Sequence, residues 1–393
     1  MDVLLNEDEK MIRDTAREYL AAECTPALVR QMEKDPLGYP PAMWAKAAEL
    51  GWQGMSLPEQ YGGLDLPLVC LGLVMEETGR ALAPIPLLST VVAVLTLARD
   101  ASEAQCQAVL PEVVSGDTVM TWAFQEEDAR LLPEAVKTRA VAQGENFVIE
   151  GTKLFVDNFN AAKLCLVACR TAPASAGNAG LSLFLVDTAA PGISAKPLVT
   201  LAKDSQSEVS FKGVRVPKAN LIGRVNEGWP VIERMLDLAT ALLCAQMLGA
   251  ARKDAEMAIE YAKYRTAFGQ PIGAFQSVGH MCADMIIGID GGALLTYEAL
   301  WMMDQGLAGK VEVSQAKAFC NDKCLVSARN SQCIHGGIGF MMEFDLHLWY
   351  RRIAAWTMRL GTGYEHRARV SAALLDVPGR VQLGRPLVAG TKA

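Results

Sequence analysis

Apolar residues change their spacing twice along this chain, and the changes divide it into three parts. Up to about residue 116 the spacing is helical: in the run MIRDTAREYL, apolar side chains recur every three or four residues. Asn6 and Glu9 precede this run with the spacing of a capping box, which predicts the beginning of a helix. The run PPAMWAKAAELGW predicts a second helix that ends at Gly51. After the turn-rich segment LPEQYGGLDL, we expect two more apolar helices before residue 115.

The spacing becomes that of strands between residues 117 and 226. The run TRAVAQGENFVIEGTKLFV alternates and turns at Gly144-Glu145-Asn146, as a β-hairpin does. LSLFLVD and SEVSFKGVRV predict further strands, and the small-residue run TAPASAGNAG at 171–180 predicts a loop. The middle part is therefore predicted to be a small β-barrel or sandwich.

Helical spacing returns at about residue 227 and persists. Residues 227–265 are enough for one extended helix, and at least three more helices follow. Long antiparallel helices with short connections are typical of a four-helix bundle. The predicted fold class is α+β, with an N-terminal helical domain at 1–116, a middle β domain at 117–226 and a C-terminal four-helix bundle at 227–393.

Composition and charge limit the function classes. A hydrophobic fraction of 51% and a charged fraction of 21% are typical of a folded protein with a large core. The net charge of -7 argues against nucleic-acid binding, which requires clustered Lys and Arg. The beginning MDVLLNEDEK lacks the apolar core of a secretory signal. The longest apolar runs, 84–98 and 236–251, are shorter than the roughly 20 residues of a membrane-spanning helix. We therefore expect no membrane segment and a cytoplasmic location.

The cysteines and histidines predict neither a disulfide framework nor a metal site. Ten cysteines are present without a CxxC pair, and the four histidines are scattered. Reduced, buried thiols in a cytoplasmic protein are the expected state.

Two stretches carry chemical information. No GxGxxG motif follows a strand, and no GxxxxGK[ST] motif occurs, so neither common phosphate-binding loop is visible. The stretch RTAFGQPIGAFQ at 265–276 leaves a helix with an arginine and an aromatic residue. The stretch CIHGGIGF at 333–340 places two glycines in an expected interhelical turn, where the backbone can approach a phosphate or a ring. Each stretch alone is also compatible with simple helix termination.

Together with LPEQYGG and FKGVRVPKANLIG, these stretches make the chain resemble the acyl-CoA dehydrogenase family of flavoproteins over nearly its whole length. The resemblance implies FAD as the cofactor, an acyl-CoA thioester as the substrate and α,β-dehydrogenation as the reaction. It also implies a dimer of dimers, as a homo- or heterotetramer, and electron-transfer flavoprotein or a similar acceptor.

The resemblance assigns cofactor contacts to particular residues. In the family, FAD lies between the β domain, the bundle and a neighbouring subunit, and Arg265 would come from that neighbour to the diphosphate. Gly336 and Gly337 would let the backbone approach the cofactor from the other side. The residues implied to bind FAD are Arg265, Phe268, Gln276, Phe155, Gln332, Gly336, Gly337 and Thr362.

Three positions beside the implied flavin depart from the family pattern. Asp157 stands where a Thr or Ser is usual, two residues after the aromatic Phe155. Phe124 stands where the family commonly has a hydroxyl that bonds the ring. Cys333 stands where many members have a glutamine, although the adjacent Gln332 offers a substitute.

The family's catalytic base is also missing. The base removes the substrate's α-proton, and in most members it is a Glu directly before the Gly-Thr pair, the position of Leu360. A minority of members place it on the first long helix of the bundle, where Ala239 stands. The nearest carboxylates in sequence are Asp237 and Glu365, for each of which a surface or capping role is the simpler expectation.

These departures leave several functions open. The chain is either a base-less subunit of a heteromeric acyl-CoA dehydrogenase, or a self-sufficient dehydrogenase with a relocated carboxylate. A third alternative is a flavin-dependent monooxygenase or oxidase on the same fold, and a fourth is a non-catalytic subunit that binds FAD or CoA. The retained Arg265 segment and the missing base favour the first.

Overall fold

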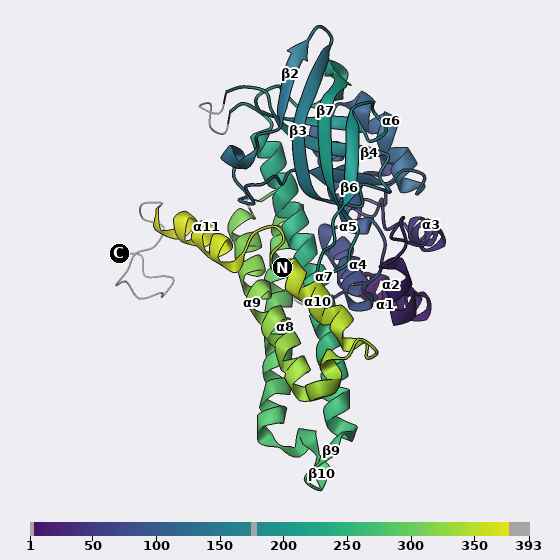
Figure 1. Ribbon diagram of the computed structural model, residues 1–393, viewed down its shortest axis with the longest axis vertical. Helices are drawn as coiled ribbons and strands as arrows, with labels where there is room; N and C mark the ends of the chain where they lie inside the picture. Colours follow the sequence, from purple (N-terminus) through teal and green to yellow (C-terminus); the bar gives the residue numbers. More distant parts are fainter. Residues whose placement is uncertain (1–3, 174–178, 308, 377–393) are drawn as a thin grey trace.

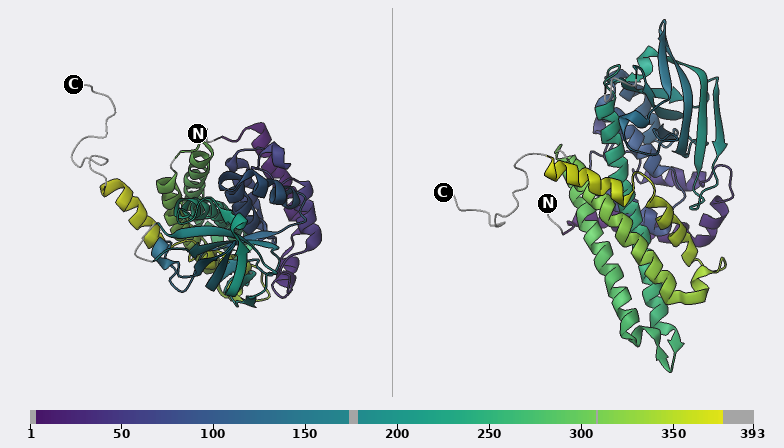
Figure 2. Two further views of the ribbon diagram at one scale, coloured as in Figure 1. Left: turned by 90° about the horizontal axis from the view of Figure 1, so that it is seen from above. Right: turned by 60° about the vertical axis from the view of Figure 1, so that its left-hand side comes forward.

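A computed structural model describes residues 4–173, 179–307 and 309–376. It contains a helical N-terminal part, a β-sheet part and a long helical bundle, with the sheet at one end of the molecule and the tip of the bundle at the other (Figure 1). The N-terminal helices lie beside the upper half of the bundle, some of them next to the sheet and the others below it (Figure 2). The N-terminal helices are α1 (Glu7–Glu23), α2 (Pro26–Met32), α3 (Pro41–Glu49), α4 (Leu68–Ala81), α5 (Leu87–Asp100) and α6 (Glu103–Val114).

Local signals in the sequence explain these helix ends. The predicted capping box is confirmed: the Asn6 side chain accepts from the Glu9 backbone N–H, and the Glu9 carboxylate accepts from the Asn6 N–H. Gly51 follows α3 in the left-handed conformation expected after a helix end. The prediction of two helices after the LPEQYGGLDL segment was wrong, because three are present. A second capping box, at Ser102 and Gln105, begins α6 and separates it from α5.

The middle part is an eight-stranded sheet in the order β6-β7-β3-β2-β4-β5-β8, with β1 paired to β4. The predicted hairpin is confirmed: β2 and β3 are antiparallel and their turn contains Gly144. Near its end β3 has a register shift against β7 between Lys153 and Val156. The strands are β1 (Met120–Ala123), β2 (Arg139–Gln143), β3 (Asn146–Asp157), β4 (Leu164–Arg170), β5 (Leu181–Asp187), β6 (Ile193–Pro197), β7 (Gln206–Pro217) and β8 (Leu221–Ile222). Part of the predicted 171–180 loop, residues 174–178, lies outside the described residues.

The C-terminal part is the predicted helical bundle. Its first helix is a single element of 36 residues, which confirms the extended helix expected over 227–265. A two-stranded hairpin at the tip joins it to the next helix (Figure 1). The bundle elements are α7 (Trp229–Tyr264), β9 (Thr266–Ala267), β10 (Gln270–Pro271), α8 (Gln276–Asp304), α9 (Lys310–His335), α10 (Leu346–Trp356) and α11 (Gly363–Leu375).

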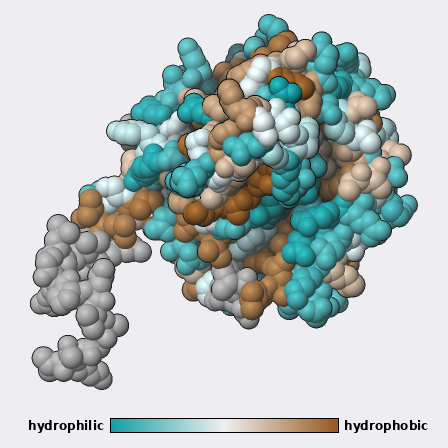
Figure 3. Space-filling view, turned by 90° about the horizontal axis from the view of Figure 1, so that it is seen from below, coloured by the Kyte–Doolittle hydropathy of each residue, from teal (hydrophilic) through white to brown (hydrophobic). Residues whose placement is uncertain are grey.

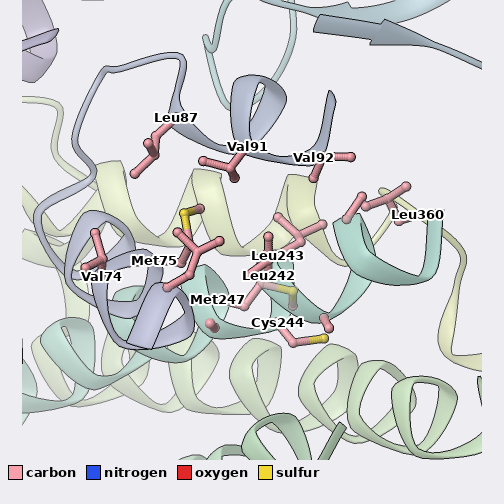
Figure 4. Packing of buried hydrophobic residues seen from close by; sticks show 14 of the residues in the cluster. Val74, Met75, Leu87, Val91, Val92, Leu242, Leu243, Cys244, Met247 and Leu360 are labelled. Atoms are coloured by element: carbon pink, nitrogen blue, oxygen red, sulfur yellow. The ribbon is translucent and has the colours of Figure 1, made fainter. Parts of the chain in front are cut away.

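One buried cluster runs through the N-terminal helices and the bundle, and a second fills the sheet. Leu360 belongs to the first cluster and lies at one end of the row of side chains that includes Leu243 and Val92 (Figure 4). Leu360 is therefore a residue of the hydrophobic core.

One helix among the described residues, α8, is long and apolar enough to cross a membrane by length and composition alone. A helix of a soluble protein passes the same test, so this is weak evidence for a membrane span. In this single chain α8 keeps Ile287 and Leu294 exposed. Seen from the tip of the bundle, the surface carries several apolar patches among polar groups (Figure 3).

Candidate functional site

A cavity of about 470 Å³ lies where the three parts of the chain meet, within the size range of small-molecule sites. An apolar wall contains Leu82, at the end of α4, and Leu88, in the first turn of α5, and α7 adds Leu243. The end of β3 adds Asp157, and the β6–β7 connection adds a polar rim. From α10 onward the lining residues are Arg352, Trp356, Arg359 and Leu360.

Leu360 is held firmly in this wall. It is 7% exposed and has a left-handed backbone with φ of 55°, which is costly for a residue with a β-carbon. The ring of His366 donates through Nε2 to the Leu360 carbonyl at 2.7 Å, and Asn321 donates to the Gly361 carbonyl at 3.2 Å. Burial lowers the pKa of His366 to about 4, so the ring is neutral at pH 7. The turn therefore has a fixed shape that points a leucine into the cavity.

Thr362 and Glu365, shortly after Leu360, stabilise the beginning of α11. Thr362 is the N-cap of α11: its hydroxyl accepts from the Glu365 backbone N–H at 3.3 Å. The Glu365 carboxylate accepts from the Thr362 hydroxyl at 2.9 Å and from its N–H at 2.8 Å. Glu365 thus completes a capping box and does not line the cavity.

The other predicted carboxylate is likewise engaged. Asp237 is a buried residue of α7 that accepts from Arg369 of α11 at 2.8 Å, and it does not line the cavity. Ala239, at the alternative base position, is completely buried. The structure therefore brings neither Asp237 nor Glu365 to Leu360.

Sequence reasoning missed an ion pair that spans two distant segments. Arg359 donates to both oxygens of Asp157, at 2.9 Å from Nη1 to Oδ1 and 2.6 Å from Nη2 to Oδ2. The two side chains are only 16% and 17% exposed. Asp157 is the carboxylate that the fold brings next to Leu360, and both of its oxygens already accept from the Arg359 guanidinium.

The remaining cavity carboxylates also have partners among the described residues. Glu33 pairs with Arg351 at 2.8 Å, and Asp204 accepts from the Thr200 hydroxyl at 2.7 Å. Asp35 accepts backbone N–H groups of its own turn. Within the described part of the chain, every carboxylate that lines the cavity is therefore already hydrogen-bonded.

The second group of predicted cofactor residues lies far from the cavity. Leu243 lines the cavity, whereas Arg265 ends the same helix roughly 33 Å further along at 1.5 Å per residue. Phe268 is at the tip of the β9–β10 hairpin, 96% exposed, with φ of 53° beside Gly269. Gln276 begins α8 and is also exposed.

The glycine pair lies at this same end of the bundle. His335, directly before Gly336, stacks on Tyr261 of α7 with ring centroids 4.5 Å apart. Gly336 and Gly337 would have open space at an added β-carbon, so their backbone is accessible. The structure thus groups them with the Arg265 end, not with the cavity.

Gln332 and the adjacent Cys333 have opposite exposure. Its side chain is 4% exposed and its Oε1 is buried without a partner, whereas Cys333 is exposed. Adjacent helical positions point about 100° apart, so Gln332 faces the bundle interior and Cys333 faces outward. The substitution of Gln332 for the family glutamine is therefore disfavoured by the geometry.

Three residues discussed above as neighbours of the flavin or of the base position have a strained backbone. Phe155, Phe268 and Leu360 all have positive φ, at 54°, 53° and 55°. Such conformations are expensive without glycine and persist where the surrounding structure imposes them, often at functional sites. Phe155 is also 39% exposed beside the register shift in β3, so its ring is presented at the surface.

These residues fit FAD unequally. Arg265, Phe268 and Gln276 form an exposed set that suits the diphosphate and adenosine half of a cofactor held across a subunit boundary. At the ring side, the position of the expected hydroxyl is a carboxylate whose two oxygens both accept from Arg359. The outer half of the predicted site therefore fits FAD, and the ring half does not.

Comparison with known proteins gives matches over nearly the whole chain. Three family models match in order: acyl-CoA dehydrogenase, N-terminal domain at residues 6–117, middle domain at 121–214 and C-terminal domain at 226–375. An acyl-CoA dehydrogenase of Bacillus subtilis is 28% identical, covering 94% of this chain and 99% of its own. The caffeyl-CoA reductase-Etf complex subunit CarC of Acetobacterium woodii is 29% identical with the same coverage.

A solved complex is also similar. A chain in the crystal structure of the ChsE4-ChsE5 complex from Mycobacterium tuberculosis superposes with a TM-score of 0.88 at 26% identity. The match covers 96% of this chain and 100% of that one.

Proposed function

Because this chain belongs to the acyl-CoA dehydrogenase family, we propose that it is a base-less subunit of a heteromeric, FAD-dependent acyl-CoA dehydrogenase. The complete enzyme would remove one hydrogen from each of the α- and β-carbons of an acyl-CoA thioester. FAD, the cofactor of this family, supplies the acceptor for the β-hydride when it is bound.

The observation that carries this proposal is the buried Leu360 at the base position. An α-proton of a thioester is weakly acidic, so its removal needs a positioned base and polarisation of the carbonyl. Leucine cannot accept a proton, and the hydrogen bonds of His366 and Asn321 fix the turn that carries it. Asp237 and Glu365 are engaged elsewhere, and Asp157 is neutralised by Arg359.

The second support is the separation between the cavity and the Arg265 end. A single chain cannot direct Arg265 and its own cavity residues to one compact site, because roughly 33 Å of helix separates them. An exposed Phe268 in a strained turn is costly in water and is explained if another subunit covers it. We propose that the segment from Arg265 to Gln276 completes the FAD site of a neighbouring subunit.

The partner would be a related chain that has the catalytic glutamate. One similar chain comes from a ChsE4-ChsE5 complex and another from a caffeyl-CoA reductase-Etf complex, and both names describe assemblies. We propose by analogy a heterotetramer built as a dimer of dimers, with electron-transfer flavoprotein or a similar protein as acceptor. A cytoplasmic location remains part of the proposal.

Co-purification tests the assembly. The tagged chain would be expressed at its native level in its own host, purified gently and measured by native mass spectrometry. The proposal predicts a mixed complex with a paralogue that has Glu at one of the two family base positions. Isolation of a homotetramer alone, active with acyl-CoA, would refute it.

A substitution at Arg265 tests whether the segment from Arg265 to Gln276 contacts the flavin of a neighbouring subunit. Arg265→Ala removes the cation at the tip of the bundle and should release flavin from the partner. Arg130→Ala is a control, since Arg130 is an exposed arginine of the sheet part whose ion pair is with Asp128, two residues away.

A further inference from the structure

The Asp157–Arg359 ion pair joins two segments on opposite sides of the cavity junction. Asp157 ends β3, and Arg359 lies in the connection between α10 and α11, 202 residues later. Both side chains line the cavity and retain about a sixth of their exposed surface. Two charged hydrogen bonds of 2.9 and 2.6 Å in parallel give the pair a fixed geometry.

The connection that carries Arg359 is itself anchored. Lys317 is fully buried in α9 and donates to the Trp356 carbonyl at 2.7 Å. His366 and Asn321 hold the two carbonyls after Arg359. Because the backbone is fixed on both sides of Arg359, its guanidinium is directed to β3 by the fold and is not a mobile surface group.

The pair changes what this wall of the cavity offers to a ligand. By resemblance, position 157 faces the flavin ring with a hydroxyl, which can both donate and accept. A carboxylate cannot donate, and here each oxygen already accepts from Arg359. A ring placed at this wall would meet no free donor from Asp157 and would lie against an ion pair that is mostly removed from water.

We infer that the Asp157–Arg359 pair keeps this chain's own cavity from holding a flavin ring, while its 265–276 segment still serves the partner's flavin. The inference rests on the proposed function, because it assigns one role to each end of the same base-less subunit. Leu360 leaves the cavity without a catalytic base, and the ion pair leaves it without a hydrogen-bond donor to the flavin ring. The two changes therefore affect the same cavity independently.

Flavin titration of the purified protein tests this inference without any turnover. FAD would be added to the folded oligomer, and binding followed by flavin fluorescence and by the shape of its visible absorption. We expect weak binding with ring fluorescence close to that of free FAD. The variant Asp157→Thr/Arg359→Met removes both charges together and restores a hydroxyl. One recovered ring hydrogen bond corresponds to roughly tenfold tighter binding, with quenched fluorescence.

A matched pair controls for general effects of charge removal. Arg369 and Asp237 join α11 to α7 at 2.8 Å outside the cavity, so Asp237→Asn/Arg369→Met should leave flavin binding unchanged. Circular dichroism confirms folding of each variant.

Two outcomes overturn the inference. One is an unmodified protein that binds one FAD per chain with a quenched ring, a result that does not depend on any variant folding. The other is a folded Asp157→Thr/Arg359→Met protein with unchanged affinity and fluorescence. Neither result bears on the missing base, which is tested separately by substrate-dependent flavin reduction.

Discussion

Removing one partner of the Asp157–Arg359 pair should destabilise the protein more than removing both. Arg359→Met leaves the Asp157 carboxylate, 17% exposed, without the cation that it pairs with among the described residues. Breaking a buried pair in this way costs about 3–5 kcal/mol, and the residual exposure of both groups places our expectation near ~3 kcal/mol. Asp157→Thr leaves an unpaired guanidinium and should cost about the same.

The double variant Asp157→Thr/Arg359→Met leaves no unpaired charge. Replacing a buried ion pair by neutral side chains is often close to neutral in stability, so we expect about 1 kcal/mol for the double change. The losses of unfolding free energy in the two single variants and the smaller loss in the double variant form a double-mutant cycle, and they imply a large coupling energy between Asp157 and Arg359. Urea unfolding at one fixed protein concentration, with FAD omitted, measures all four proteins. Single losses below about 0.5 kcal/mol that simply add would show that the pair is a solvated contact, and the reasoning would fail.

Three further predictions follow from other parts of the site. Gly361→Ala should lower the free energy of unfolding by at least about 1 kcal/mol, because φ is 92° and an added β-carbon would lie 2.6 Å from His366 Nε2; an unchanged thermal melting temperature would contradict this. His366 has its pKa lowered by burial from 6.5 to about 4, so the unfolded state binds a proton first as the pH falls. The contribution of His366 to the free energy of unfolding should therefore be fully present above pH 6.5 and decrease by about 3 kcal/mol as the pH falls towards 4. The unfolding free energy of His366→Gln, measured over the same pH range, should lack this decrease. An identical pH dependence in the variant would count against a buried neutral ring. Arg265→Ala should lower the flavin content of the assembled protein and weaken the dimer, and analytical ultracentrifugation with absorbance detection measures both; full flavin occupancy in a stable monomer would exclude a shared site.

The fold was largely predictable because local signals specify most of its elements. The capping box at Asn6 and the hairpin at Gly144 depend on neighbouring residues, and the structure confirms both. The missed boundary between α5 and α6 also has a local signal, the Ser102–Gln105 capping box. Apolar residues on both sides of that signal concealed it: α5 is mostly buried, and α6 buries Cys106, Val109, Leu110 and Val113.

The candidate site was less predictable because its contacts are long-range. The leucine at position 360 can be identified from the sequence. The partner of Arg359, Asp157, is 202 residues away, and no sequence pattern links the two positions. The burial of Gln332 was also not predictable from its position in the motif, since one residue of shift along a helix exchanges the buried and exposed faces. The distance between Arg265 and the cavity depends on α7 being one uninterrupted helix of 36 residues.

The central claim is that this chain lacks a catalytic base of its own, and anaerobic mixing with acyl-CoA tests it most directly. The Asp157→Thr/Arg359→Met protein, whose cavity is expected to hold a flavin ring, and the unmodified protein would each be incubated with FAD and mixed with acyl-CoA thioesters of varied chain length while flavin absorbance is followed. We expect no rapid bleaching, with a rate about 10²–10⁴-fold below that of the complex containing the glutamate-bearing partner. Rapid bleaching of one flavin per chain by the unmodified protein alone, unaffected by Asp237→Asn or Glu365→Gln, would contradict the account.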